Sequence, residues 1–237
     1  MVGCAPSDLV LYEDEAILVI NKPAGLLSLR DGYDKSIPHL STILTPLYGR
    51  IWMVHRLDRE TSGVMVVART AQAHHALNDQ FKYRQVVKHY HALVIGNPDW
   101  NEKKLEVNLR KDGDRQHRTT IDPKGKPSET YFKVIERFGD VSLIQASPHT
   151  GYTHQIRTHL AYLGYPLVGD GLYGKPLVNL TPIEPPDPDL PPIGRVALHA
   201  LSITFVHPLT LANPTFSSAY PQDFSNALQG LRLKEVR

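Results

Sequence analysis

The 237-residue sequence lacks the patterns that mark several common classes of protein. Its single cysteine, Cys4, excludes a disulfide framework and any zinc or iron–sulfur site built on cysteines. The longest apolar runs, at residues 16–20 and 64–68, are five residues long, whereas a membrane-spanning helix needs ~18. The first residues contain neither the basic nor the apolar segment of a secretory signal. We therefore expect a reduced, cytoplasmic protein that does not enter a membrane.

Motifs of familiar enzyme classes are also missing. The phosphate-binding pattern G-x-x-x-x-G-K-[ST] does not occur, which removes the usual support for ATP chemistry. No G-x-S-x-G is present, so acyl transfer through serine has no support. The histidines form three close groupings: His74-His75, His89-x-His91 and His154-x4-His159. None is a helical i, i+4 pair with a nearby carboxylate, so we expect no bound metal.

The charge is unevenly distributed along the chain. The formal net charge is +2, yet residues 82–137 contain thirteen Lys or Arg against eight Asp or Glu. A basic segment on a near-neutral chain is compatible with binding to a polyanion, and equally with a solvated charged surface.

Short β-type runs outnumber helical patterns and occur in clusters, which predicts an α+β fold with a long mixed, largely antiparallel sheet flanked by helices. The expected strands cover residues 9–12, 16–20, 51–54, 64–68, 90–95, 105–109, 130–136, 141–146 and 197–206. The expected helices cover residues 37–48, 153–163 and 224–233, and one that Thr70 caps and that buries Ala73, Leu77 and Phe81. The proline-rich stretch 176–192 cannot form a helix or a ladder and predicts an extended surface loop within one domain spanning 1–237.

One polar segment, residues 55–63, interrupts two apolar strands with the sequence H-R-L-D-R-E-T-S-G. Asp58 has an arginine on both sides, which favours its charged form and suits a nucleophile better than a proton donor. The spacing alone also fits a salt-bridged loop that merely closes a hairpin. A glycosidase pair formed by Asp58 and Glu60 is disfavoured, because residues i and i+2 in a turn rarely converge on one sugar.

A second polar concentration, residues 150–157, leads into the helix expected at 153–163. If Ile156, Leu160 and Leu163 face the core, then His154 and Arg157 share a neighbouring face. Arg157 could reach a carboxylate from elsewhere in the fold, although the pattern also fits an ordinary exposed arginine.

Several motifs together resemble those of the RluA-type pseudouridine synthases. Residues 55–63 resemble the family signature H-R-L-D-x-x-T-S-G, and residues 21–26 resemble N-K-P-A-G-L. Residues 88–96 resemble K-x-Y-x-A-L-V-x-G, and residues 150–160 resemble T-G-R-T-H-Q-I-R-x-H-L. Residues 164–174 resemble G-x-P-L-V-G-D-x-x-Y-G, and residues 198–208 resemble L-H-A…F-x-H-P. Six motifs in the family's order indicate a pseudouridine synthase fold and an isomerase.

The resemblance implies a reaction that turns a uridine of structured RNA into its C-glycoside without ATP, metal or redox cofactor. Asp58 matches the family's catalytic residue, which attacks either the sugar or the uracil. Arg157 matches the arginine that pairs with it, and Tyr90 the tyrosine that packs on the target base and is a candidate for the final proton removal. Arg56 matches the residue that fills the place left by the flipped base. Leu198 is expected to wall the pocket.

The resemblance also sets the expected partner, a ribosomal or transfer RNA, with no obligate protein partner and a monomeric enzyme. In the polar connection 111–126, we expect Arg115 and Arg118 to contact phosphates. Tyr152 replaces the family's usual arginine, and we expect no N-terminal accessory RNA-binding domain. The alternative function is an RNA-binding homologue of the same fold that lacks turnover.

Overall fold

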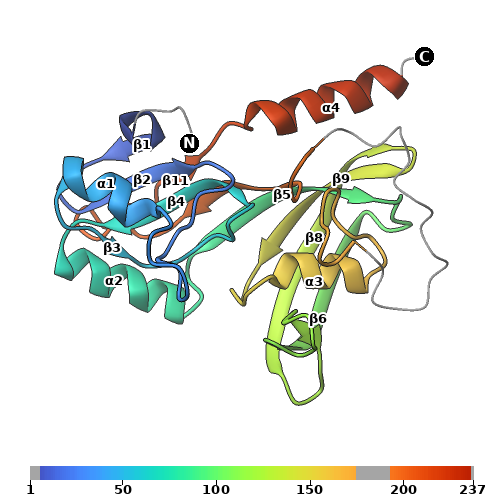
Figure 1. Cartoon of the computed structure of the whole chain (residues 1–237), viewed down its shortest axis with the longest axis horizontal. Helices are drawn as coiled ribbons and strands as arrows, with labels where there is room; N and C mark the ends of the chain where they lie inside the picture. Colours follow the sequence, from blue (N-terminus) through green and yellow to red (C-terminus); the bar gives the residue numbers. More distant parts are fainter. Residues whose placement is uncertain (1–5, 175–192, 236–237) are drawn as a thin grey trace. The chain divides into compact units, whose positions relative to one another are not determined.

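The computed structural model describes residues 6–174 and 193–235 and divides the chain into two compact units. Unit 1 comprises residues 1–88 and 200–219, and unit 2 comprises residues 89–199 and 220–237. Figure 1 shows the course of the chain. The proline-rich stretch predicted as a loop lies outside the described residues. Within the described residues, no helix is long and apolar enough to cross a membrane.

Unit 1 is built on a hairpin followed by a buried strand. A 3-10 helix (Pro6–Leu9) leads into β1 (Val10–Glu13), which pairs antiparallel with β2 (Ile17–Lys22), and β2 pairs antiparallel with β4 (Ser62–Ala68). The short β3 (Trp52–Met53) also pairs with β4, and β11 (Thr215–Ser217) pairs with β10 (Leu198–Thr204). Every residue of β4 is buried, as its continuous apolar run predicts.

Each of the two helices of unit 1 has one end that a signal in the sequence predicts. α2 (Ala71–Lys82) starts at Thr70, whose side chain accepts a 3.1 Å hydrogen bond from the backbone N–H of Ala73. The helix packs against β3 and β4. α1 (Leu40–Tyr48) ends at Gly49, which has a φ of 70°, a conformation that glycine adopts without strain.

Unit 2 carries the longer strands. They are β5 (Val87–Ile95), β6 (Glu102–Arg110), β7 (Thr120–Ile121), β8 (Lys126–Phe138) and β9 (Val141–Pro148). Their order is β5-β9-β8-β6-β7, with antiparallel pairing throughout. α3 (Gln155–Tyr162) contacts β8 and β9 (Figure 1). α4 (Gln222–Glu235) contacts β8.

α3 departs from the amphipathic helix that the sequence predicts. Residues 155–161 are all buried, including Arg157, so the reading of Arg157 as an exposed helix arginine is wrong. Ile156 and Leu160 do belong to a hydrophobic cluster of unit 2, with Leu163 packed against it, as expected. The helix can be buried on all sides because its polar side chains have hydrogen-bonding partners inside the unit.

The strands of the described residues belong to one 11-stranded sheet, which confirms the expected α+β class with a largely antiparallel sheet. The four expected helices are present with boundaries shifted by a few residues. The sequence did not indicate β7 or β11, which are only two and three residues long. The single catalytic domain stays a prediction.

Candidate active site

Asp58 lies in the loop between β3 and β4, and the residue before it is fixed by a buried serine. The Ser28 hydroxyl donates to the backbone carbonyl of Leu57 at 2.8 Å and accepts from its N–H at 3.0 Å. Ser28 is 2% exposed and Leu57 is 4% exposed, so both hydrogen bonds are shielded from water. One side chain therefore satisfies both backbone groups next to the candidate nucleophile.

The residue after Asp58 is fixed by the N-K-P-A-G-L segment. The Lys22 amine, fully buried, donates to the carbonyls of Pro23, Leu26 and Arg59 at 2.9, 2.8 and 3.2 Å. The Gly25 N–H donates to the same Arg59 carbonyl at 2.8 Å. A buried ammonium needs such partners, because an unsatisfied one is costly. Two motifs far apart in sequence thus form one rigid support for the carboxylate.

His55 opens this loop and is an anchor rather than a proton carrier. Its Nε2 accepts a 3.1 Å hydrogen bond from the Val66 N–H, and its ring stacks on Phe81 with centroids 4.7 Å apart. Burial, followed by the charge of Lys88, lowers the pKa of His55 to about 3. The ring is therefore neutral at physiological pH. The next residue, Arg56, is exposed.

We predict that Ser28→Ala lowers both stability and turnover. The substitution leaves the buried Leu57 N–H and carbonyl without a partner, at a cost of about 1–3 kcal/mol, and loosens the backbone beside Asp58. Urea unfolding and single-turnover rates measure the two effects. Ser36→Ala is the matched control, because Ser36 bonds only within an exposed turn. Equal behaviour of the two variants would show that Ser28 does not hold this loop.

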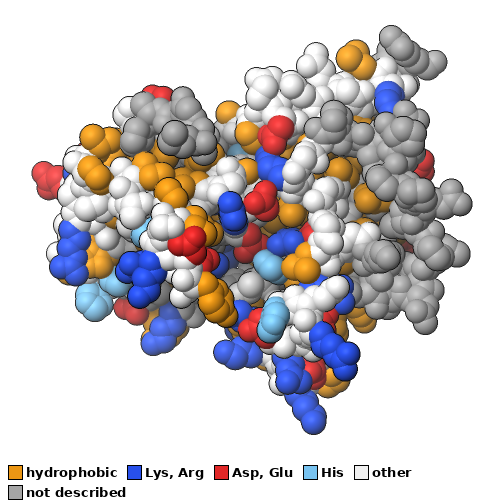
Figure 2. Space-filling view, viewed as in Figure 1, with side chains coloured by type: hydrophobic (Ala, Val, Ile, Leu, Met, Phe, Trp, Pro, Cys, Tyr) orange, Lys and Arg blue, Asp and Glu red, His pale blue; other side chains and the backbone are white. Residues whose placement is uncertain are grey.

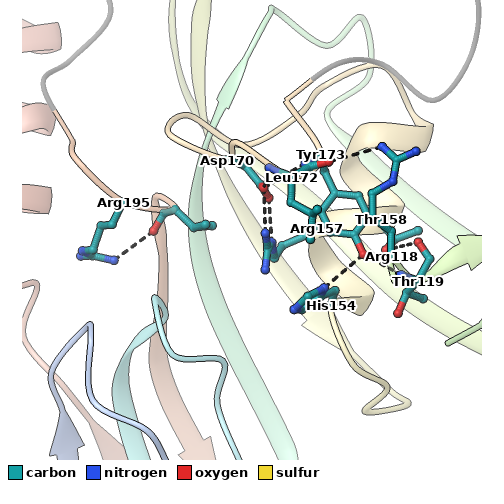
Figure 3. A network of polar contacts seen from close by, with 10 residues as sticks. Arg118, Thr119, His154, Arg157, Thr158, Asp170, Leu172, Tyr173 and Arg195 are labelled. Atoms are coloured by element: carbon teal, nitrogen blue, oxygen red, sulfur yellow. Dashed lines mark hydrogen bonds and ion pairs between the residues drawn. The ribbon is translucent and has the colours of Figure 1, made fainter. Parts of the chain in front are cut away.

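In unit 2, Arg157 is held by a buried carboxylate that the sequence analysis did not identify (Figure 3). Its Nε donates to Oδ2 of Asp170 at 2.7 Å, and its other guanidinium nitrogen donates to Oδ1 at 2.8 Å. The side chains are 9% and 0% exposed. This bidentate geometry fixes the plane of the guanidinium as well as its position. Asp170 also accepts from the N–H groups of Leu172 and Tyr173, which close the following turn.

Tyr173 completes this network. The Arg157 guanidinium lies over its ring, 5.0 Å from the centroid. Its hydroxyl accepts from the Thr119 N–H at 2.8 Å and lies 3.1 Å from Nδ1 of His154 (Figure 3). Burial raises the pKa of Tyr173, so it stays protonated. The T-G-Y-T-H-Q-I-R and G-D-x-x-Y-G motifs therefore meet around Arg157.

Tyr90 and Leu198 come together on one hydrophobic cluster of unit 2. Leu198 is 4% exposed within the cluster, and the half-buried Tyr90 packs against it. Tyr90 lies opposite Ala146 in the β5–β9 pairing. The cluster also contains Ile156 of α3, so these side chains share the core that supports the Arg157 helix.

The two arginines expected to contact phosphates differ in their surroundings. Arg115 is exposed. The side chain of Arg118 is held by two hydrogen bonds. Its Nε donates to Oδ2 of Asp114 at 2.7 Å, and a second nitrogen donates to the Leu172 carbonyl at 3.3 Å. The backbone N–H and side chain of Arg118 lower the pKa of Asp114. Arg118 thus organises its own turn, a role that the sequence did not indicate.

The expected site residues belong to two units. Arg56 and Asp58 lie in unit 1, whereas Tyr90, Arg157, Leu198, Arg115 and Arg118 lie in unit 2. The pairing of Asp58 with Arg157 stays a prediction. Sequence reasoning missed Ser28, Lys22, Asp170 and Tyr173, although all but Ser28 stand inside motifs that carry the family resemblance.

His159, one of the histidines weighed as a metal ligand, is a core residue. Its ring nitrogens lie 2.9 Å from the Ser128 hydroxyl and 3.0 Å from that of Thr130. Burial lowers the pKa of His159 to about 4, so the ring is neutral. Among the residues that the structure describes, no group of three or more His, Cys, Asp or Glu could hold a metal.

Comparison with known proteins places this geometry in a family. Residues 16–162 match the RNA pseudouridylate synthase family. Ribosomal large subunit pseudouridine synthase C of Vibrio vulnificus is 36% identical over 230 residues, which cover 95% of this chain and 70% of that protein. The protein of the same name from Escherichia coli K12 is 36% identical over 234 residues, covering 96% and 71%. Human RNA pseudouridylate synthase domain containing 4 superposes with a TM-score of 0.78 at 25% identity, covering 96% and 94%.

The fold and the matched motifs define an RNA-modifying isomerase. The chain belongs to the RNA pseudouridylate synthase family, as the RluA-type motifs indicated. Its enzyme class is therefore that of a pseudouridine synthase.

Proposed function

We propose that this enzyme converts one or more uridines of large-subunit ribosomal RNA to pseudouridine in the cytoplasm, acting as a monomer, with Asp58 as nucleophile. The substrate is suggested by the names of the bacterial relatives, and transfer RNA is a second candidate of the same class. The observation that carries the proposal is the anchoring of the residues on both sides of Asp58 by Ser28 and Lys22. A carboxylate on so rigid a loop is preorganised for attack.

In the proposed reaction, the bond between N1 of uracil and C1′ of ribose breaks, the base turns, and C5 bonds to C1′. The C5 proton leaves and N1 gains one, so no electrons are exchanged with an acceptor. Asp58 reacts as the carboxylate. In this proposal, Arg157, which Asp170 orients, favours the charged form of Asp58 because the guanidinium carries the opposite charge.

The other residues handle the base. Tyr90 packs against the uracil and removes the last proton, while Leu198 walls the pocket. Extraction of a stacked uridine costs a few kcal/mol, and Arg56 occupies the vacated place. Its exposure beside the Asp58 loop suits this role.

The RNA backbone is held by basic side chains of the β6–β8 region. Figure 2 shows Lys and Arg side chains gathering at the lower end of the view, where the β6 segment projects. The exposed Arg115 and Lys111 belong to the connection 111–126, which follows β6. We assign phosphate contact to Arg115 and the shaping of the turn to Arg118.

The direct test uses RNA transcribed with uridine tritiated at C5, since formation of the new carbon–carbon bond releases that tritium to water. Unmodified transcripts of 23S ribosomal RNA and of transfer RNA are compared. Tritium release from the ribosomal transcript supports the proposal. RNA binding without release would favour the alternative, a homologue that lacks turnover.

We expect Arg115 to contribute to the affinity for RNA and Arg56 to contribute to the rate of product formation. Arg115→Gln should weaken binding and reduce the slope of log K against log salt by about 0.7–0.9, because one phosphate contact is lost, with little change in turnover at saturation. Arg56→Ala should bind RNA almost normally but form product slowly, because the flipped state is no longer held. Salt-titrated binding and single-turnover rates test the division. The opposite pattern would reverse the two roles.

A further inference from the structure

The segment between β2 and α1 contains a closed loop, residues 28–38 (Figure 1). The ends of the loop lie side by side, because Leu27 and His39 form a parallel β-bridge and the Leu40 N–H donates to the Leu27 carbonyl at 3.0 Å. Compact surface loops whose ends meet are frequently functional. The side chains that this loop presents to solvent are therefore candidates for contact with a ligand.

Tyr33, in the middle of this loop, has a relative exposure of 101%, so none of the described residues covers its ring. The turn around it is nevertheless shaped by side-chain hydrogen bonds. Oδ1 of Asp31 accepts from the N–H groups of Tyr33 and Asp34, both at 2.8 Å. Oδ1 of Asp34 accepts from the N–H and the hydroxyl of Ser36 at 2.9 and 2.6 Å. A formed turn thus holds an aromatic ring in water, where burial does not stabilise it.

The loop begins at the residue that supports the Asp58 segment. Ser28 hydrogen-bonds to both backbone groups of Leu57, and Tyr33 is five residues further along the chain. Five residues span at most ~18 Å, which limits the distance between Ser28 and Tyr33. A stacked strand advances about 3.4 Å per nucleotide, so nucleotides about five positions from the target cover such a distance.

The side chains near Tyr33 in the sequence suit a nucleic acid better than a protein. Arg30 and Lys35 are exposed in the same loop, and the side chain of Arg59, next to Asp58, is 59% exposed. Open aromatic faces combined with cations are typical of surfaces that bind single-stranded nucleic acid. A docking surface for another protein would expose a contiguous apolar patch. Residues 30–36 contain no apolar side chain besides that of Tyr33.

We propose that Tyr33 stacks on an unpaired base of the RNA substrate that flanks the target uridine. This inference rests on the proposed function and names a further substrate-binding residue for it. The ring face makes the contact, so the hydroxyl of Tyr33 is not required. Stacking on an aromatic ring tolerates any base, so Tyr33 contributes affinity rather than sequence choice.

The first test measures binding of an unmodified 23S ribosomal RNA transcript at several salt concentrations. Tyr33→Ala should bind about tenfold more weakly, whereas Tyr33→Phe should bind like the unmodified enzyme, because it keeps the ring. The slope of log K against log salt should not change, because no phosphate contact is lost. The Tm of Tyr33→Ala should also stay the same, because the ring is fully exposed.

Tyr83→Ala is the matched control for this assay. Tyr83 is 63% exposed in the same unit, but the Lys82 amine already lies 5.1 Å from its ring centroid. Its variant should bind the transcript normally. Normal affinity of Tyr33→Ala, or a loss that Tyr33→Phe shares, would overturn the proposal.

The second test observes the stacking directly by fluorescence. Tyr33→Trp should lose emission on RNA binding, beyond any change that Trp52 and Trp100 show in the unmodified enzyme, because a stacked base quenches an indole. Tyr83→Trp should show no such loss. Absence of quenching in Tyr33→Trp would overturn the proposal, as would a dimer that Tyr33→Ala dissociates without a change in RNA binding. Absence of tritium release from any RNA by the unmodified enzyme would instead refute the proposed function, and the two binding readouts would still decide the contact.

Discussion

Asp58→Asn is expected to abolish pseudouridine formation while leaving a folded protein that still binds RNA. The amide keeps the shape of the side chain but has no charge with which to attack. We expect a loss of at least 10³-fold in single-turnover rate, equivalent to about 4 kcal/mol of transition-state stabilisation. Tritium release under saturating enzyme measures the rate, and unfolding and RNA binding verify that the rest of the protein is intact.

Glu60→Gln is the matched control for this result. Glu60 lies in the same loop, and its side chain is 44% exposed. Under the proposed mechanism it takes no part in catalysis, so its variant should retain nearly full activity. Residual activity of Asp58→Asn within about tenfold of the unmodified enzyme, ~1.4 kcal/mol, would contradict the nucleophile assignment.

Separating the Arg157–Asp170 pair is expected to have the second largest effect. Arg157→Met leaves the Asp170 carboxylate charged and buried, which should cost about 3–5 kcal/mol of stability in addition to activity. The double variant Arg157→Met/Asp170→Asn should recover most of the stability, because the Asn carbonyl still accepts from Leu172 and Tyr173 and no buried charge remains. Turnover should stay lost, because the guanidinium is missing.

This pair of readouts distinguishes an arginine that orients the nucleophile from one that only fills the core. Denaturant unfolding and single-turnover rates are measured on the same preparations. If the double variant regained activity together with stability, the role of Arg157 would be structural, and its assignment to catalysis would be wrong.

The sequence predicts the elements of this fold well where a local signal exists. Thr70 marks the start of α2 and Gly49 the end of α1, and both are found in those roles. The environment of α3 could not be predicted, because the polar residues of a helix do not reveal whether partners surround it. Gln155 illustrates this: it is buried because it bonds to Thr130, Thr150 and the Glu129 carbonyl.

In the candidate site, too, the sequence indicates individual residues but not the surroundings that hold them. Asp58 and Arg157 could be singled out from their motifs, yet what holds them could not. Ser28 and Asp170 act on residues 29 and 13 positions away, through contacts that only the folded chain creates. Arg118 has the charge that a phosphate ligand needs, but its guanidinium already donates a hydrogen bond to Asp114. A pattern identifies a chemical group, whereas its availability depends on the fold.

The most direct measurement is a map of pseudouridines in the total RNA of the source organism, with the gene present, deleted, and restored as Asp58→Asn. The account predicts that one or more sites in large-subunit ribosomal RNA lose the modification on deletion, regain it with the unmodified gene, and remain uridine with Asp58→Asn. Identical maps for all strains would contradict it, as would restoration of the modification by the Asp58→Asn gene.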